Sequence, residues 1–215
     1  MTRRINFGCG KNPTKDWLNF DNSPAIILAN SPIKYWLIKN LKLLSKEQIE
    51  NVNWNKKNKI YFLDVKNKLP FENDSVECIY ASHMLEHLSR KEAFFFINES
   101  LRVLKKEGVL RLSVPDLQII INDYKQNNNA DAFMEKILVA PPPIETIKQK
   151  ILLFFSGYRH HQWMYDEKSL FKLLKKIGYK DVFVCKAGET NIANPGHLNL
   201  YERSEESVYV EAIKR

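Results

Sequence analysis

Residues 80–90, with the sequence YASHMLEHLSR, place His83, Glu86 and His87 in the order H-x-x-E-H. Imidazoles and a carboxylate at this spacing could bind a metal ion or transfer protons, and the same pattern holds zinc in the inverted zinc peptidases. A peptidase would need the motif within a long helix, with both imidazoles on one face and a third ligand downstream. Here the first histidine directly follows VECIYAS (76–82), an apolar run typical of a buried strand. We therefore expect the motif in a strand-to-helix turn, which argues against a peptidase.

The segments that must position this motif alternate between strand and helix patterns. Short apolar runs predict strands at 3–10, 17–21, 59–65, 76–82, 109–114, 181–187 and 208–214. Helical periodicity predicts helices at 33–44, 90–106, 116–126 and 166–178. The alternation is typical of an α/β fold with a mostly parallel sheet and helices on both faces, and the last two strands predict an antiparallel edge. We expect one domain over 1–215, with insertions at about 24–58 and 127–163.

Composition narrows the class of protein and of partner. Lysine and arginine (33) outnumber aspartate and glutamate (25), and the formal charge of +8 favours anionic partners such as nucleic acid, phosphorylated metabolites, nucleotide sugars or a membrane face. The lysines are nevertheless scattered among asparagines, which is typical of an ordinary solvated surface. The three cysteines form no C-x-x-C pair, so we expect neither a thiolate zinc site nor disulfides, and a reducing cytoplasm fits best. No apolar run is long enough for a signal peptide or a membrane span.

Groups suited to binding a nucleotide follow three successive predicted strands. The first strand ends in NFGCGKN (6–12), whose glycines let the backbone approach a ligand. Asp21 follows the second strand and is placed to accept from ribose hydroxyls, and Asp64 follows the third and is placed to accept from an adenine amino group. In such sheets ligands bind at the carboxyl ends of the strands, where the strand order reverses. The sequence therefore predicts a nucleotide-like ligand at this edge.

The motifs also resemble a known family. INFGCG, WLNFD, FLDVKNKLPFENDSVECIYASHMLEHL and ESLRVLKKEGVLRLSVPD, in this order, are similar to the class I S-adenosylmethionine-dependent methyltransferases. More narrowly, they resemble the small group associated with cell-wall and surface-glycan biosynthesis. The resemblance covers residues 5–116, and 158–182 also fits. It implies a Rossmann-like fold with a seven-stranded, mostly parallel sheet, an antiparallel last strand, and S-adenosylmethionine as the cofactor.

Carried over to this chain, the resemblance implies a set of residues that surround the cofactor. They are Asn6, Gly8, Cys9, Gly10, Asp21, Asp64, Val65, Ser82 and His83. Gly8 and Gly10 would pass beside the methionine part, and Asp21 would hold the ribose. Asp64 and Val65 would lie at the adenine.

The end of the fourth strand would place Ser82 and His83 beside the sulfonium, but the first loop departs from the family. Asn6 replaces the usual acid before the glycines, so an expected anchor for the cofactor's ammonium is missing. Asn12 replaces the last glycine, and asparagine tolerates a left-handed turn. The first two strands are too close in sequence for the usual helix between them, and residues 33–44 are expected to fill that space.

Three interpretations of the H-x-x-E-H motif stay open. Glu86 and His87 could cap the following helix. His83 or His87 could act as a general base or orient the acceptor, because the fourth strand ends at the methyl donor. A divalent metal is also an option, since some methyltransferases of ubiquinone synthesis and of small-RNA 3′ ends hold one with E-x-x-E-H at this position. His83, Glu86 and His87 would then be ligands, and the added nitrogen would favour a softer metal than magnesium.

The pair His160–His161, in YRHHQW, falls where the family's substrate-covering segment is expected. A neutral imidazole suits removal of a proton from a sugar or phenol hydroxyl while the methyl group arrives. His83, His87, His160 and His161 are thus the candidate catalytic residues. Arg159 could hold a phosphate of the substrate, or be a surface arginine.

The sequence therefore predicts an S-adenosylmethionine-dependent O-methyltransferase with a small acceptor, anionic or phosphorylated: a sugar, a nucleotide sugar or a glycan intermediate. The two insertions would cover the acceptor site. One alternative is methylation of RNA, which the charge favours, although the chain has no appended binding module and no N-P-P-Y-type loop. Another is an interaction domain whose altered glycine loop has lost the cofactor. The acceptor atom and the oligomeric state stay open.

Overall fold

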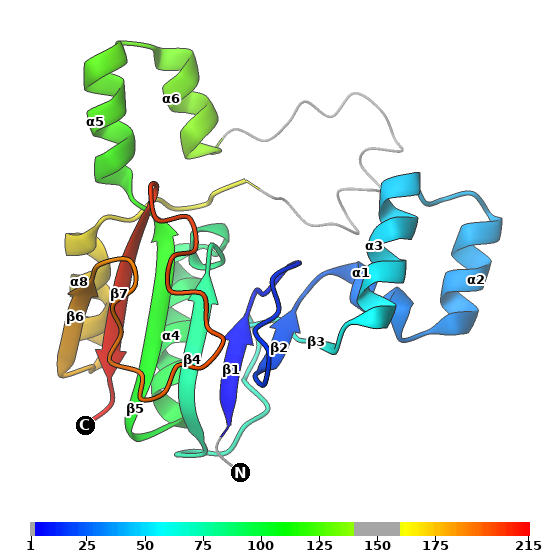
Figure 1. Cartoon of the computed structure of the whole chain (residues 1–215), viewed down its shortest axis with the longest axis horizontal. Helices are drawn as coiled ribbons and strands as arrows, with labels where there is room; N and C mark the ends of the chain where they lie inside the picture. The colour runs from blue at the N-terminus through cyan, green and yellow to red at the C-terminus, as the bar shows by residue number, and fades with distance from the viewer. Residues whose placement is uncertain (1–2, 140–159) are drawn as a thin grey trace.

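The computed structural model, which describes residues 3–139 and 160–215, contains one seven-stranded sheet (Figure 1). Its strand order is β3-β2-β1-β4-β5-β7-β6. The strands are β1 (Arg4–Phe7), β2 (Leu18–Asp21), β3 (Ile60–Phe62), β4 (Val76–Ser82), β5 (Leu104–Pro115), β6 (Asp181–Cys185) and β7 (Ser207–Ile213). Only β7 runs antiparallel to its neighbours among the strands of this sheet, and the others pair in parallel. The predicted Rossmann-like fold with an antiparallel last strand is confirmed.

The described helices fall into three groups along the chain. Between β2 and β3 lie α1 (Pro24–Ala29), α2 (Pro32–Asn40) and α3 (Lys46–Lys57). A 3₁₀ turn, η1 (Leu85–His87), and α4 (Arg90–Val103) connect β4 to β5. After β5 come α5 (Leu117–Asn127) and α6 (Ala130–Ile137), and α8 (Glu167–Ile177) precedes β6.

One face of the sheet carries the main apolar core. Ile5, Phe7, Ile79 and Ala81 alternate with polar or smaller neighbours along β1 and β4, and all four are at most 1% exposed. Because successive side chains of a strand point to opposite faces, these residues meet α4 and α8, which contribute buried side chains such as Phe96. The ring of Phe96 meets Phe7 edge to face, with ring centroids 5.6 Å apart.

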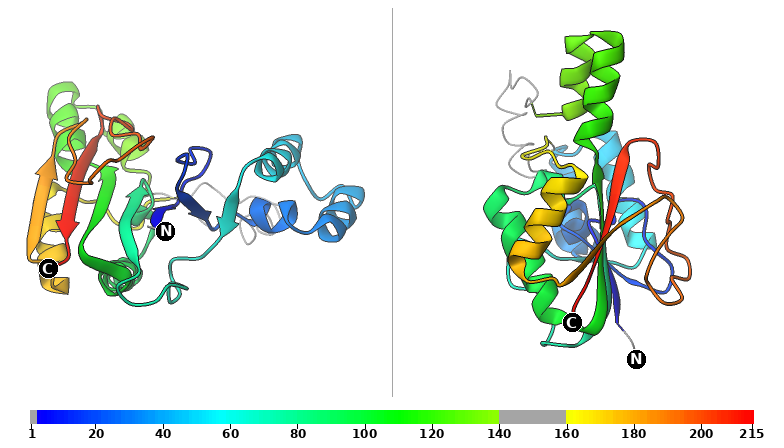
Figure 2. Two further views of the ribbon diagram at one scale, coloured as in Figure 1. Left: turned by 60° about the horizontal axis from the view of Figure 1, so that its bottom comes forward. Right: turned by 90° about the vertical axis from the view of Figure 1, so that its left-hand side faces the viewer.

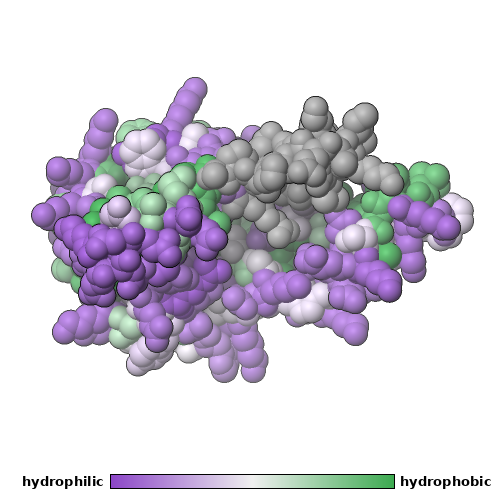
Figure 3. Space-filling model, turned by 90° about the horizontal axis from the view of Figure 1, so that it is seen from above, coloured by the Kyte–Doolittle hydropathy of each residue, from purple (hydrophilic) through white to green (hydrophobic). Residues whose placement is uncertain are grey.

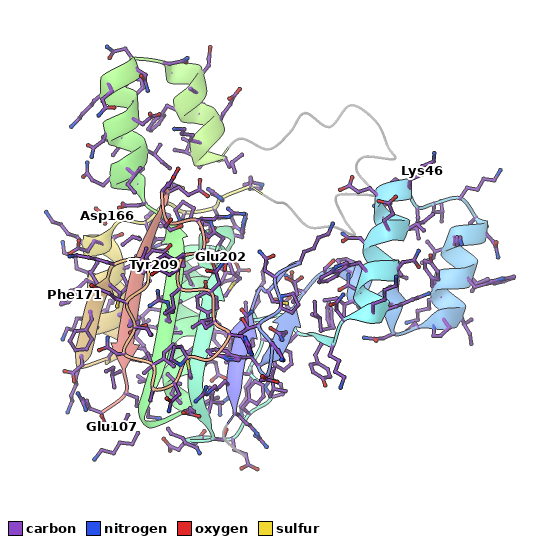
Figure 4. The ribbon with its side chains drawn as sticks, in the orientation of Figure 1. Lys46, Glu107, Asp166, Phe171, Glu202 and Tyr209 are labelled. Atoms are coloured by element: carbon purple, nitrogen blue, oxygen red, sulfur yellow. The ribbon has the colours of Figure 1, made fainter. Side chains whose placement is uncertain are left out.

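A long connection, rather than a helix, covers the opposite face at the strands β4 and β5. Residues 186–206 run across it (Figure 2, right), and their apolar side chains pack with Trp17 against Cys78. The hydroxyl of Tyr209 donates to the carbonyl of Glu202 at 2.8 Å and ties the loop to β7, where the two residues lie close together (Figure 4). Helices lie on both faces of the sheet, as expected: α4 and α8 are on the core face (Figure 2), and Ile60 of β3 packs on the other face with Ile26 of α1 and Trp54 of α3.

The boundary between α4 and β5 differs from the predicted helix 90–106. The helix ends at Val103, and Leu104 already pairs with Val76 in the sheet. Both Val103 and Leu104 are completely buried, so strand pairing overrides the helical preference of the following lysines. Gly108, two residues beyond the predicted helix, therefore lies inside β5.

The insertion 24–58 forms the bundle α1–α3 at the outer edge of the sheet, beyond β3 (Figures 1 and 2). Residues 33–44 were expected to replace a helix between the first two strands, and this was wrong, because α2 packs on α1 and not on β1 or β2. Several apolar side chains of this bundle are exposed, including Ile33 at 76% and Trp36 at 63%. In Figure 3 this end of the molecule shows apolar (green) surface interspersed with polar (purple) surface.

Candidate active site

The site lies where four parallel strands end side by side. In the order β3-β2-β1-β4, the carboxyl ends bring together Asp64, Asp21, Gly8 and Ser82 at one edge. The strand order reverses at β1, which makes this edge the place where an open α/β sheet binds its ligand. The sequence-based expectation that these residues share one edge is thus met by the topology.

The turn after β1 leaves room for a ligand at one glycine and none at the other. Gly8 has φ +66°, and a Cβ there would lie 2.7 Å from Cβ and Cγ of Met84. Gly10 has φ +51°, and a Cβ there would meet no atom within 4 Å. Both turns favour glycine because a side chain in the left-handed region is strained. The space beside Gly10 lets a ligand approach the backbone closely.

Cys9, between these glycines, supports the turn. It is buried, and its N–H donates to the Phe20 carbonyl at 3.2 Å. Burial, together with the Asp21 carboxylate, raises the pKa of the Cys9 thiol to about 12. The thiol therefore stays protonated at neutral pH and is no nucleophile.

The two acids keep free acceptor capacity. Asp21 accepts from the N–H of Gly10 through Oδ2 at 3.0 Å and from the N–H of Ser23 through Oδ1 at 2.8 Å. Asp64 accepts from the N–H of Lys66 through Oδ1 at 3.0 Å, beside the buried Val65. A carboxylate accepts up to about four hydrogen bonds. Both acids can therefore still receive hydroxyl or amino donors from a nucleoside.

Asn6 is engaged within the protein. It is 2% exposed, and its amide nitrogen donates to Oγ1 of Thr14 at 3.2 Å and to Oδ1 of Asn19 at 3.1 Å. Asn19 in turn receives the Thr14 N–H at 2.8 Å. The structure thus gives Asn6 the role of holding the short connection between β1 and β2, and its contact with a cofactor stays a prediction.

Comparison with known proteins agrees with this geometry. Residues 6–112 match the model of a family described as "Methyltransferase domain". A solved S-adenosylmethionine-dependent methyltransferase of Thermotoga maritima, described as a possible histamine N-methyltransferase, is 14% identical with a TM-score of 0.53, over 100% of this chain and 83% of that one. Another, from Methanosarcina mazei, is 16% identical with a TM-score of 0.52, over 99% and 92%.

The chain is a class I S-adenosylmethionine-dependent methyltransferase. At these identities the solved structures show the fold alone, and no functionally curated protein matches the sequence. S-adenosylmethionine is the cofactor, and the open side of Gly10 with the spare acceptors of Asp21 and Asp64 fits it. The alternative of a non-catalytic interaction domain is therefore not retained. None of the helices in the described part of the chain is long and apolar enough to cross a membrane.

In this methyltransferase, His83 uses both ring nitrogens within the protein. It directly follows β4, in the left-handed region with φ +47°. Nε2 lies 2.8 Å from Oγ of Ser207, and Nδ1 lies 3.0 Å from a guanidinium nitrogen of Arg203. Because a guanidinium only donates, Nδ1 accepts and Nε2–H donates to Ser207. His83 thereby ties β4 to β7, and its role beside the sulfonium stays a prediction.

Glu86, His87 and His161 come together next to this turn. Ligand atoms of the three side chains all lie within 4.8 Å of one another. The rings of His87 and His161 are 5.0 Å apart between centroids, and Nε2 of His161 lies 4.0 Å from Oε1 of Glu86. Burial lowers the pKa of His161 from its ordinary value, although the Glu86 carboxylate raises it in part. Burial of His161 thus favours its neutral form.

The motif does not cap the next helix, which was one of its three open interpretations. Ser89 caps α4 instead, accepting from the N–H of Glu92 at 3.3 Å while the Glu92 carboxylate accepts from the N–H of Ser89 at 2.8 Å. The three residues of η1 also make no long helix, so the zinc-peptidase geometry is absent from the H-x-x-E-H motif. The side chains of Glu86 and His87 therefore take no part in capping α4.

The segment 160–163 reaches the motif through its backbone. The N–H groups of Gln162 and Trp163 both donate to the carbonyl of Glu86, at 2.7 and 3.2 Å, and the carbonyl of His160 faces Nδ1 of His87 at 3.2 Å. These long-range contacts bring His161 next to Glu86 and His87. Arg159, considered for a phosphate, lies outside the described residues.

Proposed function

We propose that this methyltransferase transfers a methyl group to a hydroxyl of a small anionic acceptor: a sugar, a nucleotide sugar or a glycan intermediate. Bound S-adenosylmethionine supplies a methyl group on an activated sulfonium. The observation that carries the proposal is the cluster of Glu86, His87 and His161 beside the end of β4, the strand end nearest the switch point of the sheet. Such polar groups suit an acceptor that must be oriented by hydrogen bonds and relieved of a proton.

The residues of this chain would divide the work by position. Gly10, Asp21 and Asp64 would hold the cofactor, and His87 and His161 would orient the acceptor hydroxyl for in-line attack. Positioning of this kind contributes a large part of the barrier reduction when the electrophile is already activated.

The insertion 127–163 is proposed to cover the acceptor. Its described part contains α6, and the carbonyl of Leu138, which follows this helix, accepts from the N–H of His161 at 2.9 Å. This contact supports a cover that reaches the site. The insertion 24–58 stands at the other end of the sheet, so its part in the cover rests on the sequence-based expectation alone.

The acceptor class rests on charge and on family resemblance. The net charge of +8 favours an anionic acceptor, and the resemblance favours a sugar. RNA would share the attraction to positive charge, but the lysines are scattered along the chain. The cytoplasmic location stays a prediction from the cysteines.

Two measurements test the proposal in order. Calorimetry with S-adenosylhomocysteine should show binding to one site, and no binding at millimolar ligand would contradict the assigned cofactor. Transfer from labelled S-adenosylmethionine is then measured with nucleotide sugars, simple sugars, amines and short RNA. Alkali-stable label on a sugar is the expected result. Label confined to an amine or to RNA would overturn the acceptor class and leave the methyltransferase assignment intact.

A further inference from the structure

We propose that Glu86, His87 and His161 bind a divalent transition-metal ion, and that its open positions take the acceptor hydroxyl. The ion-binding part rests on the geometry alone, and the acceptor part rests on the proposed function. His161 thus replaces His83 in the ligand set expected from the sequence.

Glu86 provides the first argument, because its carboxylate is buried without a hydrogen bond. The residue is 1% exposed, and neither carboxylate oxygen has a hydrogen-bond partner among the residues that the structure describes. The nearest basic groups are ring nitrogens of His83 at 3.4 Å and of His161 at 4.0 Å. A buried carboxylate without hydrogen bonds is costly unless a cation lies next to it. A bound metal ion would satisfy it.

His87 provides the second argument, because its hydrogen bond leaves the outer nitrogen available. Nδ1 lies 3.2 Å from the carbonyl of His160, and a carbonyl only accepts, so Nδ1 carries the proton. The lone pair of the neutral ring is then on Nε2. Metal-binding histidines typically donate their other ring N–H to a carbonyl or a carboxylate in this way.

The backbone holds the two halves of the cluster in place. Gln162 and Trp163 donate their N–H groups to the carbonyl of Glu86, and the amide of Gln162 donates to the carbonyl of His87 at 2.7 Å. Ligands of a tetrahedral ion at about 2.1 Å are roughly 3.4 Å apart. The ligand atoms lie within 4.8 Å of one another, so side-chain shifts of about an ångström would bring them to the spacing of a tetrahedral site.

The donor set indicates the kind of ion. Two imidazole nitrogens and one carboxylate oxygen suit Zn²⁺, Mn²⁺ or Fe²⁺, whereas Mg²⁺ prefers oxygen ligands and keeps its water. Three protein ligands also leave coordination positions for a substrate, as in catalytic sites.

The ion would act on the acceptor hydroxyl. A hydroxyl bound to the metal loses its proton to water more readily, since coordination lowers its pKa. An oxygen lone pair then forms the bond to the methyl carbon, and the electron pair of the broken C–S bond stays on sulfur, giving S-adenosylhomocysteine. Glu86, His87 and His161 do not change during this step.

The test measures binding of the metal alone. Chelator-treated full-length protein is titrated with Zn²⁺, with Mg²⁺ for comparison, by calorimetry, and the visible spectrum of bound Co²⁺ reports nitrogen coordination. We expect one equivalent of Zn²⁺ to bind. Its affinity should fall about 100-fold or more in Glu86→Gln and His161→Ala, by analogy with the loss that follows disruption of metal sites. His197→Ala, at an exposed histidine, is the matched control and should bind like the wild type.

The variants remain informative if folding changes. Zn²⁺ should raise the Tm of the wild type and of His197→Ala, but not of Glu86→Gln, because only a folded site binds the ion. Absence of stoichiometric Zn²⁺ binding, or equal Zn²⁺ affinity in the wild type and Glu86→Gln, would overturn the proposal. Binding of S-adenosylhomocysteine to the metal-free protein is measured in parallel, so failure of the metal site and failure of the methyltransferase assignment can be told apart.

Discussion

Replacing Gly10 by alanine should separate cofactor binding from folding. A Cβ at Gly10 would touch nothing within 4 Å, so the variant has no clash in the protein. It carries only the strain of φ +51°, about 1–2 kcal/mol for a residue other than glycine. For a chain of this length that lowers Tm by roughly 2–8 °C, at about 2–4 °C per kcal/mol. The hydrogen bond from the N–H of residue 10 to the Asp21 carboxylate is kept.

Cofactor affinity should fall much more than stability in Gly10→Ala. The new methyl group would occupy the space in which S-adenosylmethionine is expected to approach the backbone. We expect the Kd for S-adenosylhomocysteine, measured by calorimetry, to rise at least about tenfold, which corresponds to about 1.4 kcal/mol. Thermal unfolding of the same samples measures the stability.

Gly196→Ala is the matched control for this experiment. Gly196 also has positive φ, +64°, and also has no atom within 4 Å of a Cβ. It lies in the loop 186–206, whose Asn194 carbonyl is bound by Arg4 at the start of β1, the opposite end from the site. Gly196→Ala should lower Tm by a similar amount and leave the Kd unchanged. A wild-type Kd in Gly10→Ala would refute the reasoning, because the cofactor would then not lie against this glycine.

Three further changes test two ion pairs and one exposed side chain away from the site. Arg111→Met leaves the fully buried Glu211 carboxylate, now 2.6 Å from the Arg111 guanidinium, without its cation, so we expect a loss of about 3–5 kcal/mol in the free energy of unfolding by urea denaturation; a loss below 1 kcal/mol would contradict this. Arg102 lowers the pKa of Glu99, so the Glu99 charge stabilises the folded state above the ordinary glutamate pKa and this contribution disappears as the pH falls through the lowered value. Glu99→Gln should therefore cost about 1–3 kcal/mol at pH 7, and the difference from the wild type should narrow in acid, where an unchanged difference would refute the assignment. Trp36→Ser, at an exposed residue of α2, should change the free energy of unfolding by less than about 0.5 kcal/mol, and a larger loss would mean that Trp36 is covered in solution.

The common position of Gly10, Asp21 and Asp64 at one edge of the sheet could be predicted, because its determinants are local. A glycine turn directly after β1, an acid at the end of β2 and an acid two residues beyond β3 reach the same edge in a parallel arrangement of these strands. Elements whose limits depend on distant pairing were less predictable. The residues after Val103 have a helical composition and become strand because β4 and β7 lie on either side of them.

The sequence did not show which histidines lie in the proposed acceptor site, because their positions depend on hydrogen-bond partners far along the chain. His83 lies beside Glu86, but its two ring nitrogens contact Ser207, 124 residues away, and Arg203. His161 enters the cluster because the backbone after it binds the carbonyl of Glu86. The H-x-x-E-H spacing therefore predicted the right turn and only two of the three clustered side chains.

The hydrogen-bond partners of each imidazole ring also indicate which histidines can bind a metal ion or a proton. A ring with both nitrogens engaged in the protein, as in His83, can position a strand end but has no free lone pair for a proton or a metal. His87 has one nitrogen fixed by a carbonyl and the other available, which is the arrangement of a ligand. If Glu86, His87 and His161 share an ion, none of them is a free base, and removal of the acceptor's proton depends on the metal. His83→Gln should then impair folding more than catalysis, whereas His161→Ala should impair metal binding and turnover together.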